Sequence, residues 1–191
     1  NTVSYCENHG VVNSTVVKGR TTLGGVVGFI QNAKTNVTRC YNKESAVVKN
    51  TADASVAVSL GGIVGRIEAT NGANTISYCD NSGAITFAGA NGTEDLLSGA
   101  GGILGIQAKT ATTLTIDHCD NYGDVTKSGA GNTNIYVGGI AASLQGNATS
   151  IVSNCINKSG ADITNESTGA AGAYNTATAG IVAYQKTGEV N

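Results

Sequence analysis

The chain of 191 residues contains no proline, tryptophan or methionine and only two phenylalanines. Its apolar residues are mostly valine, isoleucine and alanine, which argues against a core of helices packed through large side chains. Small β-branched residues instead favour pleated strands around a narrow interior. Because proline is absent and 27 glycines are present, chain reversals must depend on glycine, asparagine and serine.

Charge is also scarce, with 13 acidic and 11 basic residues and a formal net charge of -2. No lysine or arginine run provides the positive surface that nucleic acid or an anionic membrane would need, so neither is an expected partner. No apolar segment approaches the roughly 20 residues of a membrane span. The chain begins at Asn1 without a signal-like segment, which favours a mature protein or an excised piece.

Two short motifs recur in phase along the whole chain. The first has the form [V/I]-[S/T/D]-x-C-x-N, and its successive cysteines are 34, 39, 40 and 36 residues apart. The second is a small-residue pair followed by apolar residues, and a third apolar patch follows each motif asparagine. Each unit therefore predicts three short strands. The second motif occupies residues 24–28, 61–65, 101–105, 138–142 and 179–183.

Three short strands cannot bury an apolar face alone, but stacked copies pair every strand with its equivalent above and below. We therefore expect an all-β fold, a right-handed parallel β-helix (β-solenoid) of about five three-stranded coils with a triangular section. Residues 1–191 are expected to form a single domain. No unit has an apolar stripe at helical spacing long enough for a helix.

Stacking in register predicts two inner columns of identical side chains. An asparagine column can donate to one neighbour and accept from the other, so each amide is satisfied along the axis. The cysteines are interpreted as small buried hydrophobes and free thiols, because their odd number argues against full disulfide pairing and their linear spacing against a metal site. The predicted structural ladder is Cys6, Cys40, Cys79, Cys119 and Cys155, with Asn8, Asn42, Asn81, Asn121 and Asn157.

A third set of side chains gathers at the outer edge of the same corner. Aromatic rings in a row can stack on sugar rings or on a partner protein, and an arginine between two tyrosines can make cation–π contacts. The alternative is an ordinary cross-strand ladder that covers the turn. The candidate ligand or partner surface is Tyr5, Arg39, Tyr41, Tyr78, His118 and Tyr122.

The Gly-rich segments and the C-x-N segments together resemble the GLUG-type and related β-helix repeats of bacterial surface proteins. Gly10, Gly83 and Gly123 complete the C-x-N-x-G form of that repeat, whereas the second and fifth copies carry insertions before Ser45 and Gly160. The resemblance covers essentially the whole chain. It implies an extracellular or cell-surface location and a spacer or adhesive role, with no catalytic residues to transfer.

Enzyme chemistry finds little support in these residues. The chain has two histidines, no G-x-S-x-G nucleophile motif and no phosphate-binding loop, and its carboxylates are interpreted as solvated turn residues. We expect a non-catalytic structural or adhesive module without metal or cofactor. The alternative is a carbohydrate-binding or polysaccharide-degrading β-helix whose site lies in loops 89–100, 127–136 or 165–178.

The two ends fit the repeat register. Joining Asn191 to Asn1 would place the next cysteine 17 residues after Gly180, within the observed 15 to 17. The chain is therefore either an excerpt of a longer array or a subunit that stacks on other copies of itself. Its expected partners are neighbouring repeats or other copies, and a host glycan or protein.

Overall fold

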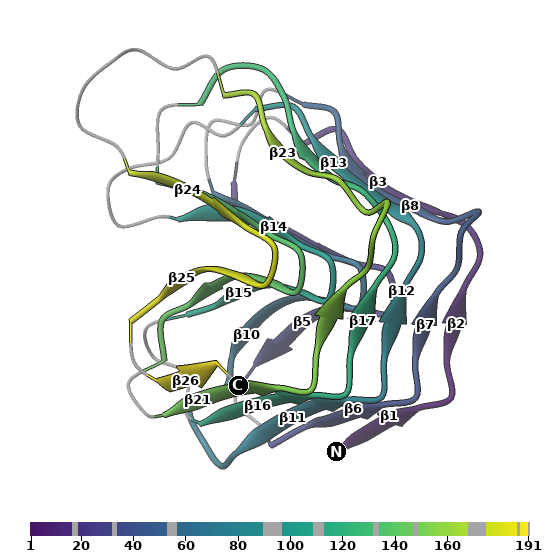
Figure 1. Cartoon of the computed structure of the whole chain (residues 1–191), viewed down its shortest axis with the longest axis vertical. Coiled ribbons are helices and arrows are strands. Elements are labelled where there is room, and N and C mark those ends of the chain that lie inside the picture. The colour runs from purple at the N-terminus through teal and green to yellow at the C-terminus, as the bar shows by residue number, and fades with distance from the viewer. Residues whose placement is uncertain are drawn as a thin grey trace.

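The computed structural model describes residues 1–16, 19–31, 34–52, 57–89, 97–108, 113–131, 134–146, 149–167, 175–186 and 188–190. Within these residues every regular element is a β-strand and none is a helix. Equivalent strands of successive units lie one behind another in Figure 1 and pair in parallel. The prediction of an all-β parallel solenoid is therefore confirmed.

Within the described residues each full coil contributes five strands, so the prediction of three strands per coil was wrong. The first coil contains β1 (Thr2–Ser4), β2 (Glu7–Asn8), β3 (Val11–Ser14), β4 (Thr21–Gly24) and β5 (Val27–Gln31). The C-x-N motif and the Gly-Gly motif each contain a turn between two strands. The C-x-N motif bends at the residue before cysteine, and the Gly-Gly pair reverses the chain between β4 and β5.

Five parallel sheets result, each named here after its first strand, and the described residues give them the following members. The β1 sheet continues with β6 (Asn36–Thr38), β11 (Asn74–Ser77), β16 (Leu114–Asp117), β21 (Ser150–Ser153) and β26 (Gly188–Val190). The β2 sheet continues with β7 (Tyr41–Asn42), β12 (Asp80–Asn81), β17 (Asp120–Asn121) and β22 (Ile156–Asn157). The β3 sheet continues with β8 (Val47–Asn50), β13 (Ala84–Phe87), β18 (Val125–Lys127) and β23 (Ile163–Asn165). The β4 sheet continues with β9 (Val58–Gly61), β14 (Ser98–Gly101), β19 (Ile135–Gly138) and β24 (Thr176–Ala179). The β5 sheet continues with β10 (Val64–Glu68), β15 (Leu104–Gln107), β20 (Ala141–Leu144) and β25 (Val182–Gln185).

The cross-section is indented and not triangular. In each coil the chain runs inward along its strand of the β4 sheet, turns at the small-residue pair and runs outward along its strand of the β5 sheet (Figure 1). One apolar cluster, including Ile67 and Ile116, fills the space between the β1 and β5 sheets. A second, including Leu60 and Ile85, lies between the β3 and β4 sheets, and a third around Tyr136 lies between the β4 and β5 sheets. Both inner sheets are therefore covered on their two faces.

The indentation requires a glycine at its tip. A β-carbon added to Gly62 would lie 2.2 Å from the carbonyl oxygen of Gly102 and 2.4 Å from the side-chain carbon Cγ of Asn81. These separations are far shorter than a normal contact between heavy atoms. The Gly-Gly turn therefore packs directly against the asparagine column of the β2 sheet, which closes the side of the solenoid.

Candidate functional site

The five predicted asparagines form a continuous hydrogen-bonded ladder inside the β2 corner. The amide of Asn8 donates to the side-chain oxygen of Asn42 at 2.8 Å, and that of Asn42 donates to Asn81 at 2.7 Å. The same bond joins Asn81 to Asn121 and Asn121 to Asn157, each at 2.7 Å. The ladder fixes the corner and leaves its inner amides no exposed surface for a ligand, since Asn81 and Asn121 are fully buried.

The five cysteines are free thiols in one column. Cys40, Cys79 and Cys119 are buried, and burial raises the pKa of the Cys40 thiol to about 11. The expectation of burial was wrong for Cys6, which is exposed because its coil is the first and has no described coil on its outer side. It holds only in part for Cys155, which is half-buried. Among the described residues, no three His, Cys, Asp or Glu side chains are grouped as a metal site would require.

The residue before each cysteine adopts the left-handed backbone conformation. The φ angles are +55° at Tyr5, +52° at Arg39, +53° at Tyr78, +50° at His118 and +53° at Asn154. This conformation turns the chain between the β1 and β2 sheets, and it is uncommon for residues other than glycine and asparagine. The five side chains point out of the solenoid as a consequence, and all five residues are exposed.

Four of these side chains stack on one another along the outer edge, and we call Tyr5, Arg39, Tyr78 and His118 the edge stack. The guanidinium carbon of Arg39 lies 5.7 Å from the ring centre of Tyr5 and 5.4 Å from that of Tyr78. The rings of Tyr78 and His118 are stacked with centres 4.9 Å apart. The predicted cation–π contacts of Arg39 are confirmed. Because Tyr78 has a neighbour on each face, it presents its ring edge and hydroxyl to solvent.

The two remaining tyrosines of the predicted surface, Tyr41 and Tyr122, lie in and beside the β2 sheet. The ammonium group of Lys43 lies 4.7 Å from the ring centre of Tyr41 and 2.8 Å from the carboxylate of Glu7. The ammonium group of Lys158 lies 5.5 Å from the ring centre of Tyr122. Lysine therefore covers one face of each ring, and the predicted surface consists of two neighbouring rows of side chains.

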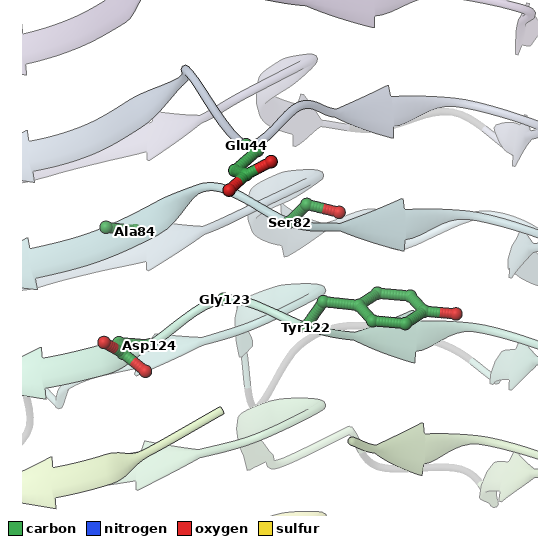
Figure 2. Close-up of a pocket in the computed structure, with 6 residues that line it drawn as sticks. All are labelled: Glu44, Ser82, Ala84, Tyr122, Gly123 and Asp124. Atoms are coloured by element: carbon green, nitrogen blue, oxygen red, sulfur yellow. The ribbon is translucent and has the colours of Figure 1, made fainter. Parts of the chain in front are cut away.

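A shallow hollow opens beside the second row, at the corner between the β2 and β3 sheets. It has a volume of about 420 Å³. Figure 2 shows Glu44 on the coil above, Ser82 and Ala84 on the middle coil, and Tyr122 and Asp124 on the coil below. Its lining residues are Glu44, Ser82, Ala84, Tyr122, Gly123 and Asp124.

Of the residues that line this hollow, the sequence places only Tyr122 in the predicted ligand or partner surface. The sequence does contain a signal for the hollow. Of the five residues that directly follow a ladder asparagine, Ser82 has a small side chain and the other four have large ones. The insertion before Ser45, which includes Glu44, predicts a longer corner but carries no signal of a binding site. The predicted loop sites at 89–100, 127–136 and 165–178 overlap residues 90–96, 132–133 and 168–174, which lie outside the described part of the chain.

Asp117 joins the edge stack to the coil that follows it. Its carboxylate accepts hydrogen bonds from the Ser153 hydroxyl at 2.7 Å and the Asn154 amide at 2.9 Å, and lies 2.8 Å from the Nδ1 atom of His118. The bonds from Asn154 and His118 lower the pKa of Asp117 from 3.8 to about 2. The ionised carboxylate is therefore favoured in the folded chain.

This pKa predicts a loss of stability in acid. A carboxylate whose pKa is lower in the folded than in the unfolded state contributes stability that is present above pH 4 and is lost as the pH falls to about 2. Because the side chain is 28% exposed, solvent screening reduces this contribution to about 1 kcal/mol. Urea unfolding between pH 5 and pH 2 should show this loss in the wild type and not in Asp117→Ser, since serine holds the equivalent place at Ser77 and Ser153. An equal acid dependence of the two proteins would contradict the assignment.

Comparison of the chain with protein-family models, with curated proteins and with solved structures gives no match. The described residues also contain no helix long and apolar enough to cross a membrane.

Proposed function

We propose that the chain is a non-catalytic structural and adhesive repeat module of a secreted or cell-surface protein or appendage. Membership of the GLUG-type repeats, a right-handed winding and a count of five coils are parts of this proposal. Its partners are the neighbouring repeats or copies of the chain, and a host glycan or protein that contacts the outer edge.

The edge stack is the observation that carries the proposal. Parallel pairing in register places its side chains at the spacing of the strands, about 4.8 Å apart along the axis. Tyr5 and Tyr78 are 72% and 48% exposed, although large apolar groups on a surface are usually few and scattered. A row of exposed aromatic and basic groups on a rigid support is typical of a surface that contacts a partner.

A glycan array together with binding to fixed host cells tests this function. We expect selective binding that falls at least tenfold in Tyr78→Asn and is retained in Tyr78→Phe. Asparagine is chosen because Asn154 already occupies the equivalent position, with φ at +53°. Val11→Ala, on the exposed β3 strand, is the control for a change elsewhere on the surface.

The outcomes of this experiment separate the competing functions. Absence of binding to both glycans and cells would contradict an adhesive role and leave a spacer. Release of unsaturated or reducing sugars from a polysaccharide would contradict the non-catalytic part of the proposal. That result would favour the alternative, a polysaccharide-degrading β-helix.

A further inference from the structure

The hollow at Ser82 lies where one side chain of a row is too small to fill its place. The residues that follow the ladder asparagines are His9, Lys43, Ser82, Tyr122 and Lys158. Four of them have long or aromatic side chains, and only Ser82 has a side chain of one carbon and one hydroxyl. Because the coils are stacked in register, the missing volume remains as an opening between the second and fourth copies of the motif (Figure 2).

The neighbouring large side chains do not fill this opening. Lys43 is directed away from it, toward the Tyr41 ring at 4.7 Å and the Glu7 carboxylate at 2.8 Å. Lys158 covers one face of Tyr122, and Tyr122 itself lines the hollow one coil below Ser82 (Figure 2). Tyr122 therefore offers the hollow an aromatic surface that is supported from the other side by a cation.

The opening has the height of one six-membered ring. Two coil steps of about 4.8 Å separate the coil of Glu44 from that of Tyr122, which gives roughly 9.6 Å. A ring that stacks between two surfaces needs a contact of about 3.5–4.0 Å on each side, or roughly 7–8 Å. A ligand ring can thus take the place that a larger side chain at position 82 would occupy.

The polar groups around the hollow select the chemistry of that ring. Glu44 and Asp124 line opposite sides of it, and both carboxylates accept hydrogen bonds (Figure 2). The backbone N–H of Asp162 donates to Asp124 at 2.9 Å, which holds this carboxylate in place. A matching ligand must therefore bring several donors at its edge and an apolar face for Tyr122.

We infer that the hollow binds one pyranose ring of a neutral sugar, with its C–H face on Tyr122 and its hydroxyls donating to Glu44 and Asp124. This inference rests on the proposed adhesive function and names one of its binding sites. An aromatic side chain of a partner protein would stack equally well on Tyr122 but would leave the two carboxylates without donors. An anionic sugar would be repelled by them.

Titration of the protein with the methyl pyranosides of glucose, galactose and mannose, followed by amide NMR, tests the inference. We expect shifts of the Gly83 and Gly123 amides with at least one sugar and a dissociation constant of millimolar order, typical of a small ligand in an open site. Ser82→Tyr should weaken binding at least tenfold because the new ring would occupy the hollow. Tyr122 occupies the equivalent place one coil below. Tyr122→Ala should do the same because the stacking surface is removed.

Thr51→Tyr is the matched control, since it adds the same ring at an exposed position just beyond β8 and should leave the affinity unchanged. Binding that is equally strong in Ser82→Tyr and the wild type, or no shift with any of the sugars, would overturn the inference. Binding of p-cresol in preference to every sugar would also overturn it, in favour of a protein partner.

The inference and the proposed function fail in different ways. Surface adhesion that depends on Tyr78 but is unchanged in Ser82→Tyr would overturn the sugar site and leave the adhesive function intact. Sugar binding at Gly83 and Gly123 without any adhesion to glycans or cells would support the site and contradict the function.

Discussion

Replacement of Gly62 by alanine is expected to prevent the chain from folding. The added methyl group would lie 2.2 Å from the Gly102 carbonyl oxygen and 2.4 Å from the Asn81 side chain. The first of these is backbone in the turn between β14 and β15, which the Gly102 N–H ties to the Gly138 carbonyl at 3.2 Å. The turn between β9 and β10 would have to withdraw from the asparagine ladder of the β2 sheet, which would open the apolar clusters on both sides of it. We expect a loss of more than about 4 kcal/mol in the free energy of unfolding.

Gly180 provides the control for this prediction because it is the equivalent glycine of the last turn. A β-carbon there would have no heavy atom within 4 Å. Gly180→Ala should therefore change the free energy of unfolding by less than about 0.5 kcal/mol. Circular dichroism and urea unfolding of both variants measure the difference. Equal stability of the two would show that the tip of the turn does not pack against the asparagine ladder.

The second large effect is expected for Asn81→Ala. This side chain accepts from Asn42, donates to Asn121 and donates to the Gly83 carbonyl, at 2.7, 2.7 and 3.0 Å, and it is fully buried. Removing this side chain leaves the Asn42 amide without an acceptor, and leaves the Asn121 side-chain oxygen and the Gly83 carbonyl without a donor. Because each such group costs about 1–3 kcal/mol, we expect a loss of about 3–5 kcal/mol in the free energy of unfolding.

The ladder predicts a graded effect along its length. Asn8 is only partly buried and contacts one ladder neighbour, Asn42, so Asn8→Ala should cost about 1 kcal/mol. Asn13, exposed on the outer face of β3, should tolerate alanine with a change of less than about 0.5 kcal/mol. The three variants are compared by urea unfolding. A cost at Asn81 no larger than at Asn8 would contradict a cooperative ladder.

The period and the columns could be predicted from the sequence because an in-register parallel stack repeats the same side chain at the same place. Cys79 and Asn81 each lie one coil away from the same residue type in the neighbouring repeats. In the β2 sheet, Asn81 pairs with Asn42 on one side and Asn121 on the other. Arg39 was likewise placed between two tyrosines by counting alone. Such predictions need only the register, which the motifs define.

The path of the chain within a coil could not be predicted in the same way. The sequence around Gly61, Gly62 and Val64 is apolar and compact, so it resembled one strand, although it contains the turn between β9 and β10. The bend at Tyr78 is equally hidden, because a tyrosine with φ at +53° has no recognisable local signal. Both turns are imposed by packing against the rest of the coil.

The surface features depend on positions at which the copies of the repeat differ. The shared motif, which defines the register, does not predict those positions. Cys6 matches its motif as well as Cys79 does, yet it is exposed because it belongs to the first coil. The hollow arises because Ser82 is smaller than its equivalents and Glu44 belongs to a longer corner. These exceptions determine what the outside of the solenoid can bind.

The left-handed backbone at the residue before each motif cysteine affects which residue types are stable there. At φ near +50° a residue with a β-carbon is strained by roughly 1–2 kcal/mol relative to glycine, and asparagine tolerates the conformation better than most. Backbone stability alone would therefore favour glycine or asparagine at this position. Of the five corner residues, only Asn154 is one of these two types. Tyr5, Arg39, Tyr78 and His118 carry this conformational cost, and the cation–π and stacking contacts among their side chains offset part of it.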